Sequence, residues 1–143
     1  MVRNRKNRRV AVVVVAAVAL AAAGCEPLGP DELQREVRSI HSVAAEGAVL
    51  AEQVADQSTK RTFARVQARE LSDAAEHSAE RLTDAHPAEG LDDATARAID
   101  LADRTSAAVG EVETAPDEVV GASAAASRLR ELAQQTDALA GQL

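Results

Sequence analysis

The stretch LQREVRSIHSVAAEGAVLAEQV, residues 33–54, decides the fold because its apolar residues recur at helical spacing. Seven positions alternate in steps of four and three, namely Leu33, Val37, Ile40, Ala44, Gly47, Ala51 and Val54. Residues spaced in this way lie on one side of an α-helix and form a narrow apolar seam. Pro30, Asp31 and Glu32 precede the seam, and both proline and acidic residues favour the first turn of a helix. The sequence therefore predicts a first helix over about 31–57 that buries this seam against other helices.

Three further segments carry the same signal, and two clear breaks separate them. A second helix is predicted over about 59–85, with its seam at Ala64, Ala68, Leu71, Ala75, Ser78, Leu82 and Ala85. The breaks lie at 86–90 and 113–116, where proline occurs, and they bound a third helix at about 91–113 and a fourth at about 116–140. We expect Ser58 or Thr59 to cap the second helix, and Thr114 with Asp117 to form a capping box before the fourth.

Four helices of similar length with short connections predict an all-α fold, an antiparallel up-down-up-down four-helix bundle with an alanine-rich core. No segment shows the alternation that a β-strand requires. Two alternatives remain open. In one, the first two helices form a single long helix, because residues 56–60 contain neither glycine nor proline. In the other, the chain forms a long helical hairpin that dimerises. Phe63, the single aromatic residue, is expected to fill the core near the start of the second helix.

The N-terminal segment has the layout of a secretory signal. Five cations, Arg3, Arg5, Lys6, Arg8 and Arg9, precede an apolar run from Val10 to Ala23. As a helix this run rises about 21 Å, which is too short for a bilayer core of about 30 Å. A basic flank, a short apolar run and small residues after it are typical of a cleaved leader. An uncleaved anchor helix is the alternative that this length disfavours.

The segment Leu20-Ala21-Ala22-Ala23-Gly24-Cys25 resembles the lipobox of bacterial lipoproteins. The resemblance implies that a signal peptidase recognises Ala22, Ala23 and Gly24, and that Cys25 carries a covalent diacylglycerol and an N-acyl lipid. The sequence departs from the usual pattern at Ala22, where the family commonly has leucine. The resulting division is a signal peptide over 1–24, a lipidated tether over 25–30 and a helical domain over 31–143. The implied location is the extracytoplasmic face of the cell membrane, lipid-anchored.

A second reading of the same residues is ordinary cleavage after Ala21-Ala22-Ala23, which releases a soluble protein. Such a protein would carry an unpaired thiol, because Cys25 is the only cysteine in the chain. An exposed thiol outside the cell oxidises or forms cross-links. Lipidation of Cys25 removes this problem, and we therefore favour it.

The net charge of the chain limits the classes of partner that it is expected to bind. Residues 25–143 keep 11 of the 16 basic residues and all 23 acidic residues, a net charge of −12. This charge disfavours nucleic acid, which rewards basic surfaces, and it disfavours lying flat on anionic lipid. We expect the membrane, reached through the lipid anchor, and a protein or an anionic envelope polymer as partners, with no nucleic acid.

Motifs for catalysis are missing from the sequence. It has no G-x-S-x-G nucleophile turn and no glycine-rich phosphate loop, and it lacks the Trp and Tyr that line many ligand pockets. We therefore predict no enzymatic activity and no cofactor beyond the covalent lipid. The expected role is a non-enzymatic interaction or spacer module in the cell envelope.

The second helix carries the remaining polar candidates. Arg61, Arg65 and Arg69 recur every four residues as a partner-binding stripe, although pairing with acids of neighbouring helices would also explain them. Farther along, Asp73, His77 and Glu80 have the spacing of metal ligands on one helix face. We predict no metal there, since the Glu-x-x-His motif of ferritin-like sites does not occur. Small-ligand or metal binding on this polar face is the alternative function.

Overall fold

The computed structural model describes residues 27–143, which form four helices joined by short connections. In chain order these are α2 (Pro30–Ala55), α3 (Arg61–Asp84), α4 (Asp92–Thr114) and α5 (Val119–Ala140). All seven seam positions predicted for the first helix are buried in α2. The seam predicted for the second helix is likewise buried in α3 from Ala64 to Leu82. The apolar spacing of the sequence therefore identified the inward faces of both helices.

α2 and α3 are separate helices joined by a tight turn. Gln57 adopts a left-handed φ of 55°, and the amide of Ser58 donates to the carbonyl of Gln53 at 2.9 Å, which closes the end of α2. The expected cap of α3 by Ser58 or Thr59 is wrong. The hydroxyl of Ser58 turns back to the carbonyl of Gln53, 3.2 Å away, and the residue before α3 is Lys60, whose side chain caps nothing.

α5 begins at Val119, three residues later than the predicted start at 116. The carboxylate of Glu118 accepts hydrogen bonds from the amides of Val120 and Gly121, so Glu118 is the residue that starts this helix. The predicted capping box of Thr114 with Asp117 is wrong. Thr114 ends α4, and its hydroxyl donates to the carbonyl of Gly110 at 2.9 Å.

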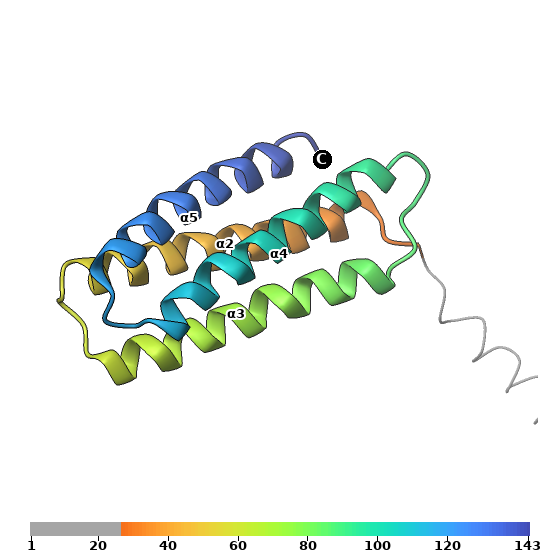
Figure 1. Ribbon diagram of the computed structural model, residues 1–143. Coiled ribbons are helices and arrows are strands. Elements are labelled where there is room, and N and C mark those ends of the chain that lie inside the picture. The colour runs from red at the N-terminus through yellow and green to blue at the C-terminus, as the bar shows by residue number, and fades with distance from the viewer. Residues whose placement is uncertain (1–26) are drawn as a thin grey trace, which may run out of the picture.

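The helices run alternately up and down and form an antiparallel four-helix bundle (Figure 1). α2 packs most extensively against α5, and α3 packs most extensively against α4. The two pairs also pack against each other, less extensively. These contacts lie between α2 and α3, between α4 and α5, and diagonally between α2 and α4. One copy of the chain thus closes its own four-helix core, and a dimerising hairpin is not needed to complete it.

Small residues hold the close pairs together. The alanines with no exposed surface include Ala44, Ala51, Ala64, Ala68, Ala75, Ala98 and Ala125. Gly47 brings three helices together, since a Cβ there would lie 2.9 Å from Cγ2 of Val109 in α4 and 3.4 Å from Cδ1 of Leu129 in α5. Between α3 and α4 the hydroxyls of Ser72 and Ser106 lie 3.0 Å apart. Close helix approach therefore supplies much of the packing that larger side chains supply in other bundles.

The chain enters the bundle beside the α3–α4 connection. Leu28 is buried, its amide donates to the carbonyl of His86 at 2.8 Å, and its carbonyl accepts from the amide of Ala88 at 3.0 Å. The side-chain amide of Gln34 also donates from Nε2 to the carbonyl of Ala140 at the end of α5, 3.0 Å away. We call this end of the bundle the base, and the opposite end, with the α2–α3 and α4–α5 connections, the tip (Figure 1).

Candidate functional site

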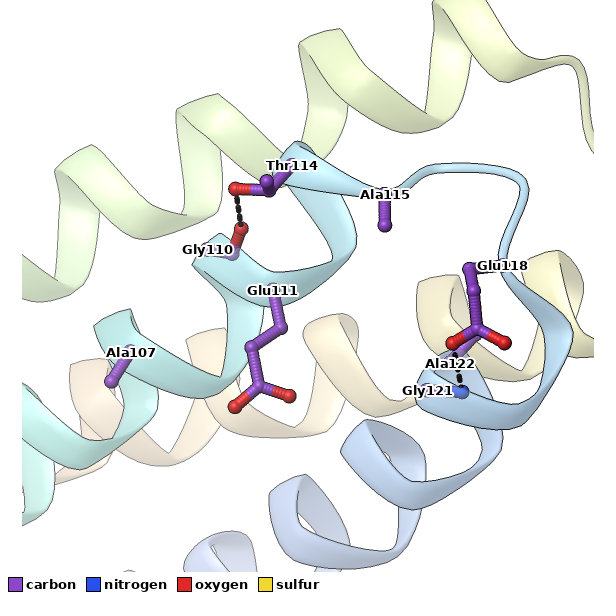
Figure 2. A pocket seen from close by; sticks show the side chains of 8 residues that line it. All are labelled: Ala107, Gly110, Glu111, Thr114, Ala115, Glu118, Gly121 and Ala122. Atoms are coloured by element: carbon purple, nitrogen blue, oxygen red, sulfur yellow. Dashed lines mark hydrogen bonds between the residues drawn. The ribbon is translucent and has the colours of Figure 1, made fainter.

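A pocket of about 440 Å³ lies at the tip, where the end of α4 meets the start of α5 (Figure 2). Its lining consists of Ala107, Gly110, Glu111, Thr114, Ala115, Glu118, Gly121 and Ala122. Five of these eight residues are alanine or glycine, so the two helix ends meet without side chains large enough to fill the space between them. The pocket exists because of these small residues.

Glu118 forms one wall of the pocket from the α4–α5 connection (Figure 2). One of its carboxylate oxygens accepts from the amide of Val120 at 3.0 Å, and the other accepts from the amide of Gly121. Negative charge at this position also faces the positive end of the α5 dipole. An added Cβ at position 121 would meet the end of the flexible Glu118 side chain, so the carboxylate would have to shift from its present position.

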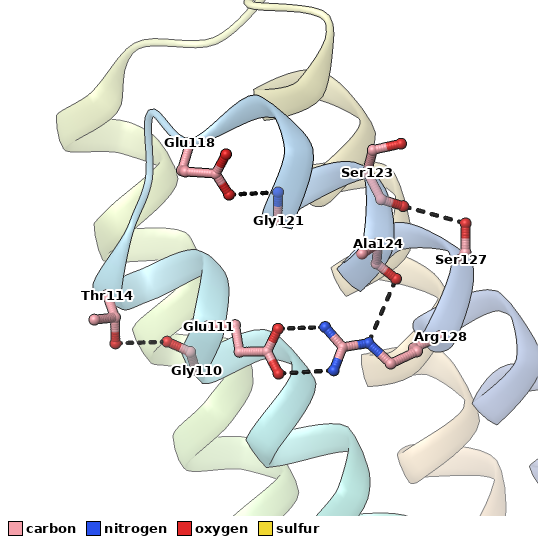
Figure 3. Close-up of polar contacts among 9 residues, drawn as sticks. All are labelled: Gly110, Glu111, Thr114, Glu118, Gly121, Ser123, Ala124, Ser127 and Arg128. Atoms are coloured by element: carbon pink, nitrogen blue, oxygen red, sulfur yellow. Dashed lines mark hydrogen bonds and ion pairs between the residues drawn. The ribbon is translucent and has the colours of Figure 1, made fainter.

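Glu111, which lines the pocket, pairs with Arg128 of α5 (Figure 3). Both terminal nitrogens of Arg128 donate to the carboxylate of Glu111, one of them at 2.8 Å, and Nε of Arg128 lies 3.5 Å from the carbonyl of Ala124. The hydrogen bond and the negative charge of Glu111 raise the pKa of Arg128 above its ordinary value. Each partner is about half exposed, at 49%, so the pair contributes no more than about 1 kcal/mol to stability.

The chemistry available in this pocket is limited. Its lining contains no histidine, cysteine or serine, and the hydroxyl of Thr114 is already bonded to a carbonyl. Glu118 is held by backbone amides and Glu111 by Arg128, so neither carboxylate is paired with a nucleophile that it would activate. This group could not be predicted from the sequence, because Glu111 and Arg128 lie on different helices and no periodic pattern connects them.

A second pocket of about 460 Å³ forms a groove between α2 and α3, also toward the tip. Its lining, which we call the α2–α3 groove, consists of Ala45, Glu46, Val49, Leu50, Gln53, Phe63, Gln67 and Leu71. The prediction that Phe63 fills the core is wrong, since Phe63 is 55% exposed and Val49 is 53% exposed. The position that enters the core is the next residue, Ala64, and a step of one residue turns a side chain by about 100° around the helix.

The arginine stripe is exposed along the first half of α3, and its three members differ in their contacts. Arg61 pairs with Asp117 of the α4–α5 connection at 3.3 Å. Arg65 and Arg69 have no carboxylate within 4.0 Å among the described residues. Pairing with acids elsewhere in the bundle therefore accounts for one of the three arginines, and within residues 27–143 the other two form no ion pair.

The acidic half of α3 does not assemble a metal site. His77 lies 3.7 Å from Glu80, and both side chains are largely exposed. Asp73 adds no third ligand, because the described residues contain no group of three or more histidine, cysteine, aspartate or glutamate side chains that could hold a metal ion.

The expected lipidation residue Cys25 and the expected peptidase recognition residues Ala22, Ala23 and Gly24 lie outside the described residues. Within residues 27–143, none of the helices combines the length and the apolar character needed to cross a bilayer.

Neither protein-family models, curated proteins nor solved structures gave a match to this chain.

Proposed function

We propose that the protein is a non-enzymatic interaction module, anchored through lipidated Cys25 on the extracytoplasmic face of a bacterial membrane. The observation that carries the proposal is the order of features in residues 1–25, with basic residues, a short apolar run, small residues and then the single cysteine. A diacylglyceryl group supplies two acyl chains, which is the number that stable anchoring requires.

The geometry of the bundle supports this attachment. Leu28, only three residues after Cys25, is hydrogen-bonded at the base beside the α3–α4 connection. An anchor at Cys25 would hold the base at the membrane and direct the tip away from it. Residues 27–143 carry a net charge of −11, so repulsion from anionic lipid favours an upright bundle over one that lies on the surface.

The distribution of exposed apolar residues supports an interaction role. Within residues 27–143, four large apolar side chains are exposed, namely Val49, Phe63, Val66 and Val120. Phe63, Val66 and Val120 lie in the first two turns of helices that begin at the tip, and Val49 lies two turns before the tip end of α2. Exposed apolar groups are thus concentrated toward the end that would face away from the membrane, where a partner can reach them.

The proposal is tested by comparing the full-length protein with Cys25→Ser in a bacterial host that processes lipoproteins. We expect the wild type to fractionate with membranes and to incorporate labelled palmitate, and the variant to lose the label. Intact-mass measurement of the purified wild type should give a chain that begins at Cys25 and carries the mass of the added lipid. An intact leader, or an unmodified thiol on Cys25, would refute the proposal.

A further inference from the structure

We infer that the α2–α3 groove docks a basic amphipathic helix of a partner protein. This inference rests on the proposed function, because it names the kind of partner that the interaction module binds. It uses two features that the packing of the bundle leaves unexplained. One is an exposed aromatic side chain in an apolar groove, and the other is a pair of glutamates, one on each helix of the groove, whose charges are not neutralised.

The first feature is the apolar surface of the groove. Phe63 on α3 and Val49 on α2 are both more than half exposed. Leu50 and Leu71 belong to the same lining. Val66 is also 53% exposed and lies one turn of α3 after Phe63, so the apolar surface continues along this helix. The apolar face of a second helix would remove this surface from water, which favours association.

The second feature is the charge of the groove. Glu46 lines it on α2, and Glu70 follows Phe63 by seven residues, which places Glu70 on the same side of α3. Both glutamates are exposed, and neither forms an ion pair within residues 27–143. Apolar surface and negative charge therefore occur together on this face of the bundle.

The register of α2 and α3 places the two glutamates at one level of the bundle. The helices run antiparallel from the turn that joins them (Figure 1), and Glu46 and Glu70 each lie nine residues from the helix end at that turn. The contact between Glu36 and Arg81 at 2.7 Å supports this register, because these residues are nearly equally far from the same two ends. Two like charges thus lie opposite each other across the groove, and a cation between them would offset their repulsion.

The arginines of α3 do not supply that cation. Arg61 pairs with Asp117 of the α4–α5 connection, which identifies its side of α3 as the side toward α4. Arg65 and Arg69 continue this row at intervals of four residues and so lie on the same side, away from the groove. Glu46 is the single charged residue in the groove lining. A partner with Lys or Arg beside its apolar stripe would therefore meet carboxylates.

The groove has two different ends, which would orient the partner. Lys60 precedes α3 at the tip, close to Phe63. Glu46 and Glu70 lie about two and a half helical turns farther toward the base. The partner helix would place its apolar residues along Phe63 and Val49, and its cations at the level of the two glutamates.

Other occupants fit less well. Copies of the chain anchored on one membrane stand at the same height, so contact between two grooves would bring Glu46 and Glu70 close to the same glutamates. An acidic helix or an anionic polymer would be repelled by these carboxylates and by the net charge of −11. A basic helix is attracted by the same charge and also covers the apolar surface.

The test is a selection of random 16-residue peptides, displayed on phage, against the full-length protein in phosphatidylcholine nanodiscs, with empty nanodiscs used to remove lipid binders. We expect the enriched peptides to carry apolar residues at positions i, i+3 or i+4, and i+7, with Lys or Arg beside them. A synthetic copy of an enriched peptide should bind at least about tenfold more weakly to Phe63→Ala. It should bind at least about fivefold more weakly to Glu46→Gln/Glu70→Gln, and added salt should weaken its binding to the wild type.

The matched control is the double variant Glu89→Gln/Asp103→Asn, which removes the same amount of charge away from the groove. Both residues are exposed, and neither forms an ion pair within the described part of the chain. This variant should change the affinity less than about twofold. Circular dichroism verifies that each variant remains helical. The Cys25→Ser protein should bind the peptide as the wild type does, so a failure of lipidation and a failure of docking give different results.

Three outcomes would overturn the inference. The first is a selection that enriches no peptides, or enriches only acidic or uncharged ones. The second is binding of a basic peptide that Phe63→Ala leaves unchanged, or that the two double variants weaken equally, since attraction to the net charge alone would then explain it. The third is a concentration-dependent dimer in sedimentation experiments that Phe63→Ala abolishes, which would assign the groove to a second copy.

Discussion

Gly47 is the residue at which α2, α4 and α5 meet. Its missing side chain leaves room for Val109 and Leu129, both of which are almost completely buried. Gly110, in contrast, has only Oγ of Ser72 near the place of an added Cβ, at 4.0 Å. These two glycines, both inside helices, therefore differ in their surroundings. Substitution by alanine should change the free energy of unfolding in opposite directions at the two positions.

We expect Gly47→Ala to lower the free energy of unfolding by about 1–2 kcal/mol, because overlap with two buried side chains outweighs the helix propensity that alanine adds. Gly110→Ala is the matched control and should raise the free energy of unfolding by up to about 1 kcal/mol. Urea unfolding followed by circular dichroism measures both changes. If both substitutions stabilise the protein equally, the side chains around Gly47 move aside to accommodate a methyl group, and the prediction is wrong.

Prediction from the sequence was least accurate at single residues. The size of Phe63, the largest apolar side chain, favours a place in the core, yet the core-facing register of α3 passes through Ala64. The sequence places Glu118 in the first turn of the fourth helix and does not predict it as the cap, because serine, threonine, aspartate and asparagine are the usual caps, whereas here a longer carboxylate bends back to the amides of α5. Periodicity determines which face of a helix is buried, but the choice of cap depends on the path of the preceding turn.

At the scale of elements, the bundle consists of two close pairs, α2 with α5 and α3 with α4. Alanine and serine occupy six of the eight buried positions of α3, so its close packing depends on small side chains. Ala75 has no exposed surface in α3, and its neighbour Ala74 is exposed. These adjacent alanines distinguish the effect of close packing from the effect of helix propensity.

We expect Ala75→Leu to lower the free energy of unfolding by about 1–3 kcal/mol, because the added atoms have no space on the buried face of α3. Ala74→Leu should change it by less than about 0.5 kcal/mol, because leucine and alanine have similar helix propensities and position 74 faces solvent. Thermal and urea unfolding of both variants provide the comparison. If the two variants lose the same stability, close packing on α3 is not the cause.

The seams of α2 and α3 could be predicted because burial repeats every three or four residues along a single helix. The pocket between α4 and α5 could not, since it depends on how two helix ends meet around Ala107, Gly110, Gly121 and Ala122. The α2–α3 groove was missed for the same reason, because Val49 and Phe63 come together only when two helices pack. The arginine stripe was visible in the sequence, but the pairing of Arg61 with Asp117 was not.

At the scale of the whole molecule, electrostatic repulsion is the main unfavourable feature of the surface. Residues 27–143 carry 22 acidic and 11 basic side chains. The ion pairs among them lie at the surface, where each contributes less than about 1 kcal/mol. An excess of like charges destabilises a compact state, and dissolved salt screens that repulsion.

We therefore expect the midpoint of thermal unfolding to rise by a few degrees between about 20 mM and about 500 mM sodium chloride, because screening of the net charge outweighs the loss of exposed ion pairs. Differential scanning calorimetry at neutral pH measures the shift. Potassium chloride serves as the control for a specific sodium effect. A midpoint that falls as salt is added would mean that the ion pairs dominate.

The backbone hydrogen bonds of Leu28 with His86 and Ala88, in the α3–α4 connection, also determine how the bundle would carry mechanical load. A pull on the N-terminal segment would reach Leu28 before it reaches the first turn of α2. The force would then be shared between α2, α3 and α4 instead of unwinding one helix from its end. A protein tethered at this point would resist shear at a moving membrane surface with several helices at once.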